Sequence, residues 1–181
     1  MTRSTLLIAV VAVIVVSALT FAVSRAVTTS PPLAIGVTAK PASRPARPAL
    51  TPAEETYMRA MWPIHGDVQR SLMRASLGQI LYKTNDLSRD ELKARLEQAL
   101  VTYRGAETRM RALQPPESLR KDHEQYLVAD RLFQESAVEA NKMFADGLED
   151  HLLAAYPKSQ EGSDKIREVG GKFWPNEFPP N

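Results

Sequence analysis

The sequence has 181 residues and no cysteine, which excludes disulfide bonds, thiolate metal sites and a nucleophilic cysteine. Residues 1–50 contain five Lys or Arg and no acid, whereas residues 51–181 contain 18 Lys or Arg against 21 Asp or Glu. The larger part of the chain is therefore mildly acidic, which argues against a nucleic-acid partner.

A continuous apolar segment lies close to the N-terminus. Leu6 to Val23 contains 16 apolar residues among 18, and at about 1.5 Å per residue it spans roughly 27 Å, close to the ~30 Å of a bilayer core. We expect residues 6–27 to form a transmembrane signal-anchor helix, with residues 1–5 in the cytoplasm and the C-terminal domain outside it. A cleaved signal peptide is the alternative, because small residues typical of cleavage sites occur in this segment. That alternative would leave a secreted or periplasmic domain.

Residues 28–50 are expected to form a linker. They contain five prolines and three cations: Pro31, Pro32, Pro41, Pro45, Pro48, Lys40, Arg44 and Arg47. Each proline restricts the residue before it to extended conformations, so the segment favours a polyproline-like spacer that reaches on the order of 70 Å. It is interpreted as a tether, or alternatively as a basic linker that touches anionic lipid heads or envelope polymers.

The first predicted helix begins after Thr51. Thr51 is a good N-cap, Pro52 suits the first helical position, and Glu54 completes a capping box. The helix is expected to end near Lys83. Pro63 lies inside it and predicts a kink, because proline removes one backbone donor and crowds the preceding turn.

The second predicted helix has the clearest periodicity in the chain. Ser88 and Glu91 form another capping box. Apolar residues then recur at alternating steps of four and three, at Leu92, Leu96, Ala99, Tyr103, Ala106, Met110 and Leu113. This spacing is typical of a helix packed along a nearly parallel neighbour. Pro115 and Pro116 are expected to end the helix.

Two further helices are expected in the C-terminal part. The third is predicted over residues 117–156, with Gly147 as a weak point and Pro157 as its end; the fourth covers residues 159–173. Residues 51–181 are thus predicted to form an all-α domain. Its fold would be an up-and-down helical bundle of three long helices plus a shorter fourth, tethered by the N-terminal transmembrane helix.

Met58, Met61 and His65 lie on one face of the first predicted helix, at positions i, i+3 and i+7. Two thioethers and an imidazole form a plausible Cu(I) ligand set, especially outside the cytoplasm. The same stripe continues into Val68 and Leu72, which favours the other interpretation, in which the methionines are core residues.

The other two histidines lie in the C-terminal half. His123 is on the inner face of the third predicted helix with Asp130 two turns later, so a buried carboxylate there could orient an imidazole from another helix. Alternatively, His123 lies at the bundle end and bonds a loop carbonyl. His151 is 28 residues further on, about 42 Å along one straight helix. These two histidines therefore cannot share a metal.

No recognisable catalytic motif occurs in the sequence. It has no His-Glu-x-x-His pair, no repeated Glu-x-x-His, no Gly-x-Ser-x-Gly and no phosphate-binding loop. We therefore expect a non-enzymatic interaction or structural module of the cell envelope, with no cofactor. Its partners would be the lipid bilayer through residues 6–27, and an envelope protein or a second copy of the chain. The alternative is an envelope bundle that binds copper or a small ligand.

Overall fold

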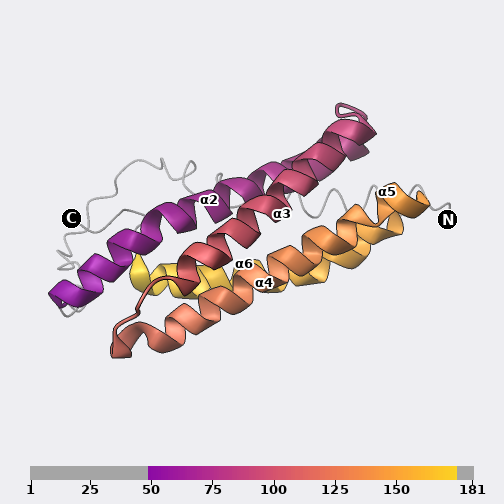
Figure 1. Ribbon diagram of the computed structural model, residues 1–181. Coiled ribbons are helices and arrows are strands. Elements are labelled where there is room, and N and C mark those ends of the chain that lie inside the picture. Colours follow the sequence, from indigo (N-terminus) through magenta and orange to yellow (C-terminus); the bar gives the residue numbers. More distant parts are fainter. Residues whose placement is uncertain (1–48, 175–181) are drawn as a thin grey trace, which may run out of the picture. The chain divides into compact units, whose positions relative to one another are not determined.

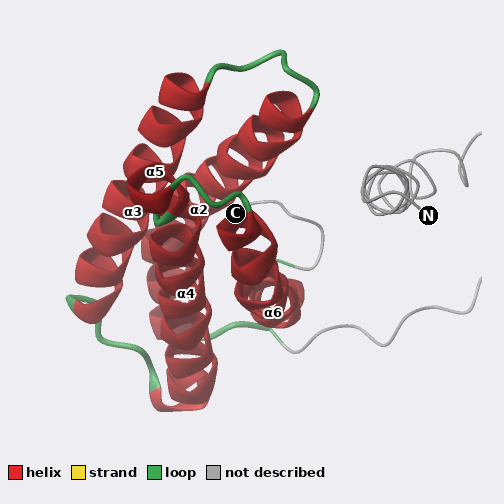
Figure 2. Cartoon of the chain, turned by 90° about the vertical axis from the view of Figure 1, so that its right-hand side faces the viewer, coloured by secondary structure: helices red, strands yellow, loops and turns green. Residues whose placement is uncertain are grey.

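The computed structural model describes residues 49–174, and every regular element in this range is a helix (Figure 2). The elements are α2 (Pro52–Lys83), α3 (Arg89–Arg111), the short 3-10 helix η1 (Glu117–Leu119), α4 (Arg120–Asn141), α5 (Met143–Asp146) and α6 (Asp150–Phe173). The all-α prediction is confirmed for this part of the chain. The expected anchor, residues 1–5, the linker up to residue 48 and the tail from residue 175 lie outside the described residues. Within residues 49–174, no helix is long and apolar enough to cross a membrane.

The four long helices run alternately up and down, as Figure 1 shows. α2 packs along α3, α3 along α4, and α4 most extensively along α6. The contact between α2 and α6, which would close the ring, is much sparser than these three. The predicted up-and-down bundle is therefore present, but one of its four sides is loosely packed.

The two predicted capping boxes are both formed. The Thr51 backbone N–H donates to the Glu54 carboxylate at 2.8 Å, and the Glu54 N–H donates back to the threonine hydroxyl at 3.3 Å. Ser88 and Glu91 repeat this exchange at 2.9 and 3.3 Å. Each box satisfies backbone donors that the first helical turn leaves free, which explains why α2 and α3 begin where the sequence predicts.

The heptad pattern of α3 marks its buried face. Six of its seven positions are buried, namely Leu92, Leu96, Ala99, Tyr103, Ala106 and Met110. The seventh, Leu113, lies beyond the helix end and is partly buried against the core. A 3.5-residue repeat keeps one stripe in contact with neighbouring helices over the full length of α3.

The predicted boundary between the third and fourth helices is wrong. The chain leaves the helical path at Gly147, whose φ of 80° is a left-handed conformation that glycine adopts without steric cost. The Gly147 N–H donates to the Met143 carbonyl at 2.9 Å, and Asp146 accepts from the Leu148 N–H at 2.9 Å. These bonds make residue 147 a helix end rather than a weak point inside a long helix.

Pro157 lies inside α6 and does not end it, contrary to the prediction. α6 is consequently 24 residues long, so the fourth helix is not shorter than α3 or α4. Pro157 and the Leu153 side chain are both exposed. The Leu153 carbonyl loses its helical partner to the proline, and at this exposed position water can take the place of that partner. Pro63 is likewise exposed inside α2, which continues through it as one helix. The kink expected at Pro63 stays a prediction.

A glycine sets the close approach of α4 and α6. A Cβ added at Gly162 would lie 2.8 Å from the Phe133 Cε1 and 3.1 Å from the Ala129 carbonyl oxygen. A larger residue would therefore push the two helices apart.

Candidate functional site

The predicted copper ligands lie at the interior of the bundle. Met58 and Met61 have no exposed surface, and the His65 Nδ1 is 2.8 Å from the Tyr126 hydroxyl of α4. Burial lowers the pKa of His65 to about 4, so its imidazole is neutral at physiological pH. Across residues 49–174, no group of three or more His, Cys, Asp or Glu could hold a metal ion. That result does not address thioether ligands, so the copper site stays a prediction.

Two histidine–tyrosine pairs join α2 to α4. Besides the His65–Tyr126 bond, the Tyr57 hydroxyl of α2 lies 2.7 Å from the His123 Nδ1 of α4. Burial raises the pKa of both tyrosines and lowers the pKa of both histidines. Each pair is therefore a hydrogen bond between neutral groups. His123 thus bonds a tyrosine and not the loop carbonyl that was the alternative for it. Asp130 bonds Gln134, and no imidazole from another helix bonds it among the described residues.

Aromatic rings surround the His65 imidazole. Its centroid lies 4.6 Å from that of Trp174 and 5.9 Å from those of Trp62 and Tyr126. Trp174 is 3% exposed, and its indole N–H has no hydrogen-bond partner among the described residues. The sequence shows these residues as separate aromatics, and only the packing of α2, α4 and the end of α6 brings them together.

Asp130 is a fully buried carboxyl group in the middle of α4. Its Oδ2 accepts a hydrogen bond of 2.9 Å from the Gln134 amide, which also donates to Glu107 of α3 at 2.8 Å. The Oδ1 has no partner among the described residues. Burial raises the pKa of Asp130 to about 7, with a smaller contribution from the Glu107 charge. This carboxyl group therefore titrates near neutral pH.

His151 lies at the start of α6 and not on the same helix as His123. Its two ring nitrogens are 2.8 Å from Glu139 and 2.7 Å from Asp146, and these hydrogen bonds raise its pKa. Because Glu139 is 16 residues after His123 in α4, His151 remains about 24 Å from it along the bundle. The two histidines are therefore still too far apart to share a metal, but the predicted separation of about 42 Å along a single helix is wrong.

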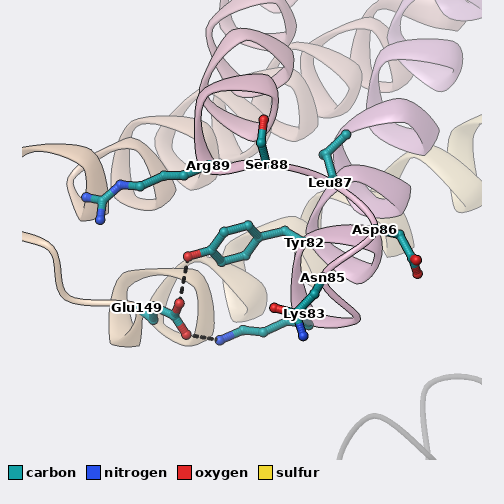
Figure 3. Close-up of a pocket in the computed structure, with 8 residues that line it drawn as sticks. All are labelled: Tyr82, Lys83, Asn85, Asp86, Leu87, Ser88, Arg89 and Glu149. Carbon is teal, nitrogen blue, oxygen red and sulfur yellow. Dashed lines mark hydrogen bonds and ion pairs between the residues drawn. The ribbon is translucent and has the colours of Figure 1, made fainter.

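A polar pocket of about 540 Å³ lies at the opposite end from Trp174 (Figure 3). In it, the Glu149 carboxylate accepts from the Tyr82 hydroxyl at 2.7 Å and from the Lys83 ammonium at 2.5 Å. Arg89 donates to the Met143 carbonyl at 2.7 Å. The bonds of Tyr82 and Lys83 to Glu149 join the end of α2 to the start of α6.

The side of the bundle between α2 and α6 is open. A groove of about 420 Å³ lies there, and its lining includes His65, Leu72, Ile166, Gly170 and Trp174. On the same two helices, four apolar side chains outside the groove lining reach into solvent: Met73 is 63% exposed and Leu77 49% on α2, and Leu153 is 53% exposed and Tyr156 51% on α6. We call the surface formed by these four residues the α2–α6 face.

The comparisons with known proteins add no functional information, since no family model, curated protein or solved structure matches this chain. The fold and its surfaces therefore carry the functional argument.

Proposed function

We propose that this chain is a non-enzymatic interaction module of the cell envelope. Residues 6–27 hold it in the membrane, residues 28–50 act as a spacer, and the bundle lies outside the cytoplasm. If the N-terminal segment is cleaved, the bundle is released as a periplasmic or secreted domain. The contact surface of the module is the α2–α6 face.

The observation that carries this proposal is the clustering of exposed apolar side chains along the loosely packed side. His65 contacts Trp174 at one end of the α2–α6 pair, and Lys83 bonds Glu149 at the other. Between these two contacts Leu72 shares a groove with Ser163 and Ile166 of α6, so Met73 lies level with the middle of α6 and Leu77 lies nearer to the level of Tyr156. Four of the eight large apolar side chains exposed in the described range belong to this face. Such clusters on soluble domains mark interaction sites more often than isolated apolar residues do.

The state of the histidines supports a non-catalytic role. His65, His123 and His151 each have a hydrogen-bond partner within the bundle. A general base must instead reach a substrate proton, and a nucleophile requires an adjacent base. The hydrogen bonds of these histidines to tyrosines and carboxylates join different helices, so they position α2, α4 and α6 relative to one another.

Site-specific photo-cross-linking in the source cell tests the proposal. A photoreactive amino acid replaces Met73 in one full-length variant and Val101 of α3 in the other; both residues are 63% exposed. We expect position 73 to cross-link to an envelope component and position 101 to give far less product. If neither position, or only position 101, is captured, the proposed contact surface is wrong.

The groove next to His65 favours a second candidate function, the binding of a small apolar ligand or of copper. His65 uses Nδ1 for Tyr126, so its Nε2 is the nitrogen left for a ligand. A native mass spectrum of the chain purified gently from the envelope would show the added mass. For copper, the Met58→Leu, Met61→Leu double variant should lose Cu(I) affinity, and unchanged affinity would exclude these thioethers as ligands.

A further inference from the structure

Beyond its first turn, the helix that borders the open side is basic, although the domain as a whole is not. α2 has four Lys or Arg and three acids, and two of these acids, Glu54 and Glu55, lie in its first turn. Residues 51–181 together carry an excess of three acids. Most acidic residues of the domain therefore lie outside α2.

Three arginines of α2 border its exposed apolar residues. At about 100° per residue, Arg59, Arg70 and Arg74 fall with Met73 and Leu77 within an arc of about 100° on the outer side of the helix. We call these five residues the basic strip. The strip and the α2–α6 face share Met73 and Leu77, so they point the same way.

The arginines of the strip are available for a partner. Arg59 and Arg74 are exposed, and their side chains bond to none of the described residues. Beyond the first turn the one acid of α2, Asp67, is held by Arg70 at 2.6 Å and by Arg109 at 2.8 Å. On α6, Asp164 is paired with its neighbour Arg167 at 2.9 Å. Glu55 lies four residues before Arg59 on the same side of α2 and offsets part of the charge. The surface therefore combines an excess of positive charge with exposed apolar side chains.

We propose that the partner of the α2–α6 face is an anionic phospholipid surface, so that the bundle lies with α2 against the membrane. This inference rests on the proposed interaction role of the face and names its partner. Arginines bind lipid phosphates, while Met73, Leu77 and Tyr156 enter the region between headgroups and acyl chains. This combination is typical of helices that lie in the plane of a membrane interface.

The charge pattern disfavours a second copy of the chain as the occupant. A twofold-symmetric contact through the strip would place its arginines opposite those of the other copy. An acidic protein groove would satisfy the same charges, and the experiment below distinguishes that case from lipid.

The expected strength follows from the number of arginines. Each basic residue near an anionic membrane contributes about a fivefold factor to the ratio of docked to undocked domain. Replacing both free arginines, in the Arg59→Gln, Arg74→Gln variant, should lower that ratio about 30-fold. The matched control is Arg104→Gln, Lys121→Gln, which removes the same charge from exposed residues of α3 and α4 whose side chains bond to none of the described residues.

The test uses the full chain reconstituted in vesicles. Because the sequence has no cysteine, Met73→Cys or Val101→Cys carries a single fluorescent label, and lipids brominated on their acyl chains quench a label that enters the bilayer. In vesicles containing phosphatidylglycerol we expect quenching at position 73, little at position 101, and loss of quenching at 73 in pure phosphatidylcholine. The Arg59→Gln, Arg74→Gln variant should lose it too, while the control variant keeps it.

The outcomes separate this inference from the proposed function. If the chain stays with the vesicles but the label at position 73 is quenched no more than that at 101, lipid is not the partner. In that case a protein cross-linked at position 73 in cells would still support the interaction module. If both charge variants reduced the quenching equally, the proposed role of the basic strip would also be refuted. Only the overall charge of the domain would then determine lipid binding. A chain that does not remain with vesicles would refute the anchor and the lipid contact together.

Discussion

Replacing Asp130 with asparagine should stabilise the bundle at alkaline pH and destabilise it modestly at acidic pH, where the carboxyl group is already neutral. The carboxyl group is fully buried, and one of its oxygens has no hydrogen-bond partner in the described part of the chain. Ionisation therefore places a charge in the core with a single amide donor, from Gln134. The Asp130→Asn change would keep the shape and the acceptor for Gln134 while removing the charge.

The magnitude follows from the shift of the Asp130 pKa from 3.8 to about 7. The folded state binds this proton more tightly than the unfolded state. Stability is therefore fully present below the unfolded pKa and is lost as the pH rises through the folded pKa. The difference between the two values corresponds to roughly 4 kcal/mol above pH 7. The amide that replaces the carboxyl group would also lack one partner, which costs about 1–3 kcal/mol. A net gain of roughly 1–3 kcal/mol at pH 8 is expected.

Urea unfolding at pH 4, 6 and 8 measures this effect. The chain has two tryptophans, Trp62 and Trp174, and both lie in the bundle, so their fluorescence reports the unfolding of this domain. His65, whose pKa is lowered, loses stability as the pH falls. The difference between the Asp130→Asn variant and the unaltered chain therefore isolates Asp130. Glu124→Gln, an exposed change on the same helix, is the control. A variant with the same pH dependence as the unaltered chain would refute the reasoning.

Three further predictions concern packing and titration. Gly162→Ala should destabilise the bundle by about 1–3 kcal/mol, because its Cβ would lie 2.8 Å from an aromatic carbon; Gly105→Ala, which meets no atom within 4 Å, should stabilise it by up to ~1 kcal/mol. Tyr126→Phe should cost about 1–2 kcal/mol, since it leaves the His65 Nδ1 without its partner. In an NMR titration His151 should have a pKa above 6.5 and His65 one of about 4.

Each of these predictions has a result that would contradict it. Equal urea midpoints for the two glycine variants would show that α4 and α6 can separate at no cost. Tyr156→Phe replaces an exposed tyrosine and should change the free energy of unfolding little. If it lowered stability as much as Tyr126→Phe does, the loss could not be assigned to the bond between Tyr126 and His65. If His151 titrated below 6.5, its bonds to Glu139 and Asp146 would not persist in solution.

The starts of α2 and α3 were predictable because they depend on residues close together in sequence. A capping box needs only Ser88 and Glu91, and a heptad needs only a repeated spacing, so α3 was placed nearly correctly. The end of the third helix depended on a choice between Gly147 and Pro157. The prediction gave proline too much weight, because an exposed proline leaves its freed carbonyl to water, whereas a left-handed glycine reverses the chain direction.

The histidine partners were not predictable, because they come from separate helices. The pairing of Tyr57 with His123 and of His65 with Tyr126 depends on the rotation of α2 relative to α4. No local spacing encodes that rotation. The loose packing of α2 on α6 is equally a property of the assembled bundle. The shared side of Arg59, Arg70 and Arg74, in contrast, could have been identified from their spacing in the sequence.

Accessibility labelling in intact cells tests most directly whether the α2–α6 face is covered. Met73→Cys and Val101→Cys are matched in exposure, so a membrane-impermeant maleimide should label both at similar rates in the purified chain. In cells whose envelope admits the reagent, we predict that position 101 is labelled and position 73 is protected. Equal labelling of both positions in cells would contradict the central claim, because the face would then be free of any partner.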